Sequence, residues 1–164
     1  LIAAYCGTFD LNAALYRFAN CVGPRSTHGV TYDFIRKLMD NPEKLTILGD
    51  GTQTKSYVYI TDVVDAMLHA LSASAGGCDI FNIGSEDAVD VVTIADIVCD
   101  VMGLKDVKYE FTGGVDGGRG WKGDVKFMAL SIEKLKALGW RPAYTSSEAL
   151  KLTAEHLYRE LSGG

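Results

Sequence analysis

The sequence has little of several residue types that mark specialised proteins. Its 164 residues include three prolines, three histidines and four cysteines, and no two cysteines form a Cys-x-x-Cys pair. Scattered histidines do not indicate a metal site, so we expect none. Separated cysteines favour a reduced, cytoplasmic protein over a disulfide scaffold. No apolar run reaches the length of a membrane span, so we expect no membrane partner.

Positive charge is also scarce. The net charge of −5 argues against a general nucleic-acid surface, because such surfaces are basic. The sequence contains no Gly-x-Ser-x-Gly elbow and no His-Glu-x-x-His, which excludes two common hydrolase mechanisms. A hydrophobic content of 48% over 164 residues is enough to form one compact core.

The most informative segment lies at 45–64. Two short apolar runs flank a Gly-Asp-Gly turn at 49–51 and a single cation, Lys55, and a helix start follows at 61–62. A turn of this kind lets backbone amides approach a ligand closely. A cation beside it suits a phosphate. The segment therefore predicts a site for a phosphorylated ligand.

Strands and helices are expected to alternate along the chain. Period-two and buried apolar runs predict strands at 13–18, 45–48, 57–60, 79–83 and 107–111. Helical spacing and cap residues predict helices at 1–5, 31–39, 62–71, 93–103, 131–139 and 145–161. This alternation indicates an α/β fold.

Three helix ends carry specific expectations. The first helix should end at Gly7 and Thr8, and it lacks a residue that would cap its start. We infer that further sequence precedes it, although a short helical start of a complete domain is the alternative. Thr93 should open a capping box, and Ser131 should cap the helix that follows it.

Two glycine-rich stretches resemble phosphate-binding motifs but lack the required context. The stretch 114–120 has the spacing Gly-x-x-Gly-x-x-Gly, yet no helix start follows it. The stretch 49–56 ends in Lys-Ser, but Thr54 stands where a phosphate-binding loop needs glycine. We reject both readings and interpret 113–120 as a mobile loop.

Five segments, in order along the chain, resemble one enzyme family. They are Tyr-Arg-Phe-Ala-Asn-Cys-Val-Gly-Pro-Arg at 16–25, Ile-Leu-Gly-Asp-Gly-Thr-Gln-Thr-Lys-Ser-Tyr-Val-Tyr-Ile-Thr-Asp-Val at 47–63, Phe-Asn-Ile-Gly at 81–84, Gly-Asp-Val at 123–125 and Leu-Gly-Trp-Arg-Pro at 138–142. Together they resemble the C-terminal half of extended short-chain dehydrogenase/reductases, and within these the NAD-dependent nucleotide-sugar epimerases of the UDP-glucose 4-epimerase type.

The resemblance implies a fold and a division of labour. It implies the C-terminal part of a Rossmann-like parallel sheet, from 1–30 and about 56–90, plus a smaller α/β substrate-binding part, from 31–55 and about 91–164. The family's NAD-binding glycine loop and its catalytic Tyr-x-x-x-Lys would precede this chain, so no catalytic residue is expected here. The complete protein is expected to use NAD, bind a UDP-hexose and form a homodimer.

The resemblance also implies individual roles near the reacting sugar. Phe18 and Ala19 match positions beside the nicotinamide of the cofactor, and Asn20 matches an asparagine that donates to the diphosphate. His28 and Val30 fall in a loop beside the substrate. Taken from the residues alone, Asn20 is a turn residue at the end of a strand and His28 an exposed loop histidine.

Further roles concern the nucleotide. Thr46 and Leu48 match a segment whose backbone pairs with uracil, although an ordinary short strand is the alternative. Lys55 stands where relatives have an arginine bound to the diphosphate. Asp124 matches a carboxylate that accepts ribose hydroxyls, or it is a plain loop aspartate.

Arg119 departs from the spacing that the resemblance implies for a substrate residue. Relatives place an arginine three residues before the carboxylate, where this chain has Trp121 instead. Arg119 lies two residues further back, so its contact with the diphosphate needs a shifted loop.

The expected function is the substrate-binding half of an NAD-dependent epimerase that works by hydride transfer through a keto-sugar. This chain alone is expected to be inactive. The alternatives are part of a nucleotide-sugar 4,6-dehydratase or decarboxylase, or a nucleotide-sugar-binding protein without catalysis. The sequence leaves the sugar and the epimerised carbon open.

Overall fold

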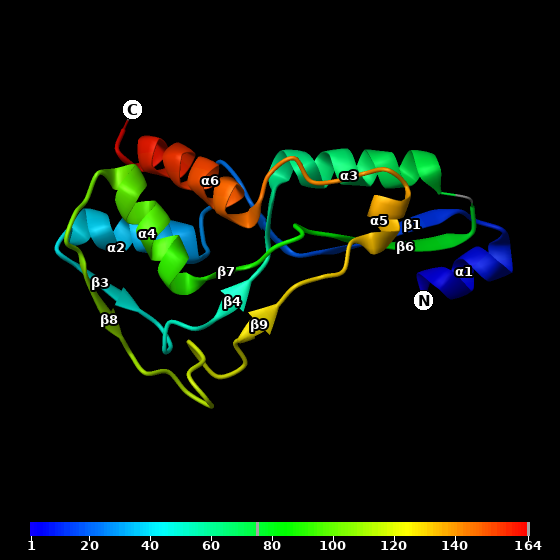
Figure 1. Cartoon of the computed structure of the whole chain (residues 1–164). Helices are drawn as coiled ribbons and strands as arrows, with labels where there is room; N and C mark the ends of the chain where they lie inside the picture. The colour runs from blue at the N-terminus through cyan, green and yellow to red at the C-terminus, as the bar shows by residue number, and fades with distance from the viewer. Residues whose placement is uncertain (75, 164) are drawn as a thin grey trace.

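A computed structural model describes residues 1–74 and 76–163 (Figure 1). Its helices are α1 (Ile2–Phe9), α2 (Val30–Asp40), α3 (Ile60–Ala73), α4 (Val91–Met102), α5 (Glu133–Ala137) and α6 (Ser146–Leu161). Its strands are β1 (Ala13–Phe18), β2 (Asn20–Val22), β3 (Lys44–Ile47), β4 (Thr54–Lys55), β5 (Tyr57–Tyr59), β6 (Cys78–Ile83), β7 (Val89–Asp90), β8 (Lys108–Phe111) and β9 (Phe127–Met128). No described helix is both long and apolar enough to cross a membrane.

One end of the molecule is built around a parallel strand pair. β1 and β6 pair in register from Ala13 opposite Cys78 to Phe18 opposite Ile83. Helix α3 runs along this pair, and α5 packs against β6 (Figure 1). A buried cluster joins these elements, centred on Phe81 and Trp140. The parallel pairing with a helical crossover confirms the predicted α/β class.

The other end holds three helices and a second parallel pair. Helices α2, α4 and α6 pack on one another, and β3 pairs with β8 beneath them (Figure 1). Their apolar faces form the second buried cluster, which includes Ile35, Leu45, Val98 and Leu157. The division of the chain into a Rossmann-like part and a substrate-binding part stays a prediction.

Short strands connect the two ends. β2 pairs with β5 in parallel, and β4 lies between β7 and β9. Ser146 fixes this junction, since its buried hydroxyl accepts from the Tyr57 amide at 3.0 Å and donates toward the Tyr57 carbonyl at 3.3 Å. The start of α6 therefore holds β5 in place.

Most predicted elements are present within a residue or two of their expected ends. The strand 13–18 is reproduced, and the capping box of Thr145 and Glu148 opens α6 as expected. The expected strand 57–60 stops at Tyr59, because Ile60 already belongs to α3. Sequence patterns set these elements because apolar spacing and cap chemistry are local properties.

Three predicted helix ends were wrong. Helix α1 continues through Gly7 and Thr8 to Phe9, and the capping residue that follows, Asp10, adopts a left-handed conformation at φ 55°. Helix α4 is capped by Asp90, whose carboxylate accepts from the Thr93 amide at 2.7 Å, so Thr93 is not the cap. Ser131 does not cap α5, which follows Ile132 without a side-chain cap.

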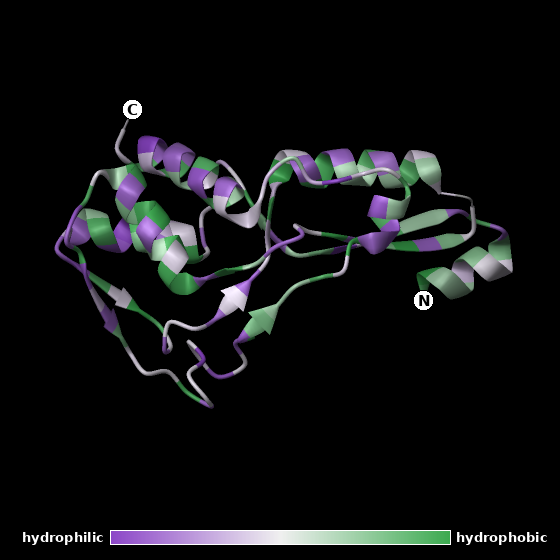
Figure 2. Ribbon diagram, viewed as in Figure 1, coloured by the Kyte–Doolittle hydropathy of each residue, from purple (hydrophilic) through white to green (hydrophobic). Residues whose placement is uncertain are grey.

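An apolar stripe on α3 faces solvent. Ile60, Val64, Leu68 and Leu71 repeat at helical spacing and are 42% to 63% exposed. Figure 2 shows further apolar residues along α1, at the same end of the molecule. A stripe of this kind on a surface favours association, because burying it removes apolar area from water.

We predict that the isolated chain self-associates through this stripe. Leu68→Lys should shift the population toward monomer, because it places a charge at the centre of the apolar surface. Ser162→Lys adds the same charge at the exposed end of α6 and serves as the control. Sedimentation velocity over a concentration series measures the effect, and a wild-type chain that stays monomeric throughout would contradict it.

Candidate functional site

Two adjoining cavities lie between the helical end and the strand junction. Cavity A has a volume of about 280 Å³ and cavity B about 510 Å³. Both are lined by Gly29, Val30, Lys55, Tyr57 and Trp121, so they meet along one wall. Each is of the order of size that small-molecule sites have.

The two cavities differ in chemistry. Cavity A is walled mainly by apolar side chains, with Asp33, Gln53 and Asp124 as its other polar residues besides Lys55. Cavity B contains more polar side chains and opens toward the end of β1. Its distinctive residues are Ala19, Asn20, Cys21, Val22, Ser26, His28, Thr31, Tyr32, Thr153 and Leu157.

Lys55 stands on the shared wall because β4 is held on both sides. It is paired with Val89 of β7 and Met128 of β9. Its ammonium contacts Asp124 Oδ1 at 2.8 Å and lies 5.6 Å from the centre of the Trp121 ring. The Lys55 side chain is 21% exposed, so it is not a solvated surface lysine.

Asp124 is a buried carboxylate that closes the glycine-rich loop. Its side chain is 3% exposed, and Oδ2 accepts from the Gly120 amide at 3.1 Å. Both oxygens therefore have a protein partner, one cationic and one from the backbone. Asp124 is therefore buried and paired, unlike a plain exposed loop aspartate, and its contact with ribose hydroxyls stays a prediction.

The neighbouring Tyr57 lines both cavities with an uncharged phenol. Burial, followed by the nearby Asp124 charge, raises the pKa of Tyr57 to about 12. Its phenol thus keeps its proton at neutral pH.

Two amides of the turn at 49–51 are used within the protein, so these two do not serve a ligand as the sequence suggested. The Gly49 amide donates to Thr112 Oγ1 at 2.9 Å, and the Asp50 amide donates to the Gly118 carbonyl at 2.9 Å. Gly49 and Gly51 have positive φ, and a Cβ on Gly51 would lie 2.5 Å from the Phe111 ring. The glycines serve close packing between two loops.

Asn20 and His28 both line cavity B, and their contacts with a substrate stay predictions. Asn20 Nδ2 donates to the Ser56 carbonyl at 3.0 Å, which fixes its amide beside Lys55. His28 is exposed on the loop before α2. Val30 and Leu48 also reach the cavities, Val30 both of them and Leu48 cavity A.

Two predicted residues lie elsewhere. Thr46 belongs to β3, where its carbonyl accepts from Lys37 Nζ at 3.1 Å, and it lines neither cavity. Arg119 lines neither cavity either; its backbone pairs with Val115 within the loop. The next element after 114–120 is β9 and not a helix, so the helix start that a dinucleotide motif needs does not follow this loop.

Phe18 and Ala19 lie at the carboxyl end of β1. Phe18 is 45% exposed, whereas Ala19 is buried and lines cavity B. In open α/β sheets ligands bind beyond the carboxyl ends of the strands. An exposed aromatic ring at this place can form one wall of a site for a planar ring.

Sequence reasoning gave no site role to several residues that line the cavities, among them Gln53, Tyr57 and Trp121. Trp121 was noted as a departure from the family pattern, although no role was given to it. Gln53 could have been found from its position between the glycine turn and Lys55. The burial of Tyr57 depends on α6, nearly ninety positions away, so no local pattern predicts it.

Comparisons with known proteins identify the class of this fold and site. Residues 1–84 match the NAD dependent epimerase/dehydratase family. The chain belongs to this family.

Its relatives match over most of this chain. A Methanocaldococcus jannaschii protein, provisionally named a UDP-glucose 4-epimerase, is 31% identical over 92% of this chain and 47% of its own length. Human dTDP-D-glucose 4,6-dehydratase is 28% identical over 97% of this chain and 45% of its own. The chain spans about half the length of the curated relatives that it matches.

Solved structures likewise match nearly all of this chain and about half of their own length. A UDP-galactose 4-epimerase is 42% identical, with a TM-score of 0.82 over 98% of this chain and 50% of its own. The Thermotoga maritima UDP-glucose 4-epimerase, solved with UDP-glucose, is 31% identical, with a TM-score of 0.76 over 96% of this chain and 50% of its own. The fold is therefore that of the C-terminal half of these enzymes.

The turn beside cavity A contains the carboxylate of Asp50, whose contacts with Thr52 and Lys126 should weaken when acid protonates it. The Thr52 hydroxyl, then Lys126, which approaches Asp50 Oδ2 to 2.9 Å, hold the pKa of Asp50 well below its usual range. Because this pKa is lower than in the unfolded chain, the stabilisation is present above the ordinary aspartate pKa. It is lost as the pH falls through the depressed value.

We predict that Lys126→Ala raises the pKa of Asp50 but leaves it below that of a free aspartate, because Thr52 still donates. NMR titration of the Asp50 carboxyl carbon measures this. Arg119→Ala, in the same loop, is the control and should leave the Asp50 titration unchanged. A pKa of Asp50 that stays fixed or falls in Lys126→Ala would contradict the assignment.

Proposed function

We propose that this chain is the substrate-binding half of an NAD-dependent nucleotide-sugar epimerase of the UDP-glucose 4-epimerase type. The observation that carries the proposal is the meeting of two cavities at Lys55, one largely apolar and one polar. A nucleotide-sugar has this sequence of parts: a nucleoside, a diphosphate and a polar sugar. The nucleoside would lie in cavity A, the diphosphate at Lys55 and the sugar in cavity B.

The diphosphate contact follows from the donors at the junction. An ammonium group has three donors, and one of those of Lys55 is used by Asp124. The remaining donors can bind phosphate oxygens with charge assistance. Asn20 lies on the cavity B side, where its amide can add a neutral hydrogen bond.

NAD fits this chain along one wall. Phe18 and Ala19, at the carboxyl end of β1, would lie against the nicotinamide. Ala19 is buried and lines cavity B, so this wall borders the cavity. NAD supplies hydride acceptance and return when bound. The residues of this chain would hold the sugar close to that wall, and orientation of this kind accounts for much of enzymatic rate enhancement.

A UDP-hexose substrate is supported by relatives whose names include UDP-galactose and UDP-glucose 4-epimerases. The human dehydratase that matches 97% of the chain supports a second candidate, a nucleotide-sugar 4,6-dehydratase. Product analysis of the complete enzyme separates the two. An epimerase returns a hexose of equal mass, whereas a dehydratase releases water. We further propose a cytoplasmic homodimer for the complete protein.

We predict that the isolated chain does not interconvert UDP-glucose and UDP-galactose and does not retain NAD. The reason is that the glycine loop and the Tyr-x-x-x-Lys of the family are not in its sequence. Coupled assay of purified 1–164, compared with the complete enzyme at equal concentration, measures this. Turnover by the isolated chain would refute the assignment of catalysis to the other half.

We predict that Lys55→Ala in the complete enzyme weakens UDP-glucose binding by about 1–3 kcal/mol, the range for a charge-assisted hydrogen bond. Lys55→Arg should retain binding, since a guanidinium donates to both phosphate and carboxylate. Asn20→Ala should act in the same direction but by less, because it removes a neutral amide. Calorimetric titration at fixed ionic strength measures all three.

The matched control is Lys122→Ala. Lys122 is exposed, lies next to Trp121 and lines neither cavity, so it reports the effect of charge alone. Thermal unfolding must accompany the titrations, because Lys55→Ala also leaves the buried Asp124 without its cation. Equal affinities of wild type and Lys55→Ala would remove Lys55 from the site.

A further inference from the structure

Gln53 is a buried amide with an open acceptor beside cavity A. It is 7% exposed and lines that cavity. Its Nε2 donates to the Leu48 carbonyl at 2.9 Å, whereas its Oε1 has no hydrogen-bond partner among the described residues. A buried acceptor without a donor is costly, and in folded proteins such groups are rare. Its presence at a cavity indicates a partner supplied by a ligand.

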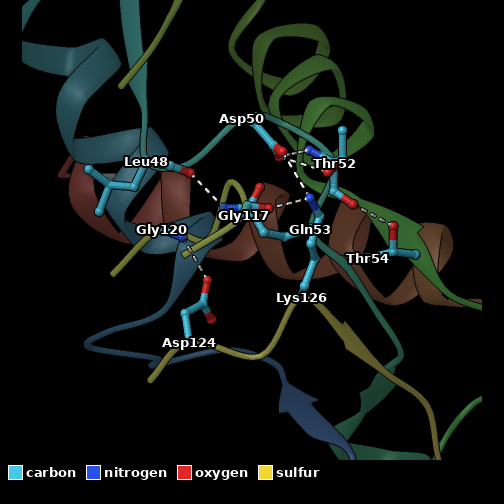
Figure 3. A network of polar contacts seen from close by, with 9 residues as sticks. All are labelled: Leu48, Asp50, Thr52, Gln53, Thr54, Gly117, Gly120, Asp124 and Lys126. Carbon is cyan, nitrogen blue, oxygen red and sulfur yellow. Dashed lines mark hydrogen bonds and ion pairs between the residues drawn. The ribbon is translucent and has the colours of Figure 1, made fainter. Parts of the chain in front are cut away.

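The orientation of this amide is determined by its neighbour. The Leu48 carbonyl can only accept, so Nε2 must face it and Oε1 must point away (Figure 3). The opposite orientation would bring two oxygens together without a proton between them. The open atom is therefore an acceptor, which a donor of a ligand in cavity A can satisfy.

The surrounding loop is built to hold this side chain. A Cβ on Gly49 would lie 1.8 Å from Gln53 Nε2, so only glycine leaves room for the amide. The Gln53 carbonyl accepts from the Val91 amide at 3.1 Å. Lys126 binds both Asp50 and the Gly117 carbonyl, and thereby clamps the turn from outside (Figure 3).

Asp124 lies close to Gln53 but is already engaged. A Cβ on Gly120 would lie 3.2 Å from Asp124 Oδ2 and 3.6 Å from Gln53 Nε2, so both side chains surround this glycine. The carboxylate oxygens accept from Lys55 and from the Gly120 amide. Gln53 Oε1, by contrast, accepts no hydrogen bond from the described residues.

We propose that Gln53 recognises the nucleoside by accepting a hydrogen bond from one of its donors, a ribose hydroxyl or the imide N–H of the base. This inference rests on the proposed function. Cavity A lies on the side of Lys55 away from Ala19, which lines cavity B only. The nucleoside, not the reacting sugar, therefore reaches Gln53. A diphosphate has no donor at neutral pH and cannot satisfy this oxygen.

The test is a comparison of ligands in the complete enzyme. UDP, 2′-deoxy-UDP, 3′-deoxy-UDP and N3-methyl-UDP are titrated into wild type and Gln53→Met, which keeps the side-chain size but has no acceptor oxygen. In wild type one analogue should bind about 3- to 10-fold more weakly than UDP, the range for a single hydrogen bond. In Gln53→Met that ratio should fall to about one. The analogue that shows the effect identifies the donor.

The ratio separates recognition from a structural role. Lys126→Ala loosens the same turn without lining either cavity, so it should weaken all four ligands equally and keep the wild-type ratio. Gln53→Asn withdraws the oxygen and should behave as Gln53→Met does, which provides a second variant if the first fails to fold. A Gln53→Met or Gln53→Asn enzyme that keeps the wild-type ratio would overturn the proposal while leaving the proposed function intact. Failure of wild type to bind UDP would overturn both.

Discussion

The ion pair between Lys55 and Asp124 is the contact on which the arrangement of the site depends. It joins two segments 69 residues apart, β4 and the end of the glycine-rich loop, with the carboxylate almost fully buried. A charge of this kind is stable only when it is paired and hydrogen-bonded, and the Gly120 amide supplies the second bond. The pair therefore places a cation at the junction of two cavities and fixes the segment that contributes Trp121 to their common wall.

The glycines of this region act by allowing close approach of protein to protein. Gly49 makes room for the Gln53 amide, and Gly51 for the Phe111 ring. Gly118 approaches Asp50, which in turn is held by Lys126. Two loops distant in sequence thus interlock beside cavity A, and the Gly49 and Asp50 amides are used between them.

The predictability of this fold from sequence differed between its parts. The strand at 13–18 and the capping box at 145–148 were predicted because apolar alternation and cap chemistry are visible in a few neighbouring residues. The cap of α4 was misassigned to Thr93, since both Asp90 and Thr93 carry suitable oxygens and only the backbone geometry decides. The site was predicted in part: Asn20, Lys55 and Asp124 converge, whereas Thr46 does not, because its place depends on the pairing of β3 with β8. Gln53 was missed because an unfilled acceptor is a property of packing.

The central claim is that the two cavities together form one nucleotide-sugar site with Lys55 at the diphosphate. A crystal structure of the complete enzyme with bound UDP-glucose tests it most directly. We expect the nucleoside in cavity A against Trp121 and Gln53, a phosphate oxygen at hydrogen-bonding distance from Lys55 Nζ, and the hexose in cavity B beside Asn20. A UDP-glucose molecule bound elsewhere, or bound here with Lys55 contacting Asp124 alone, would contradict it.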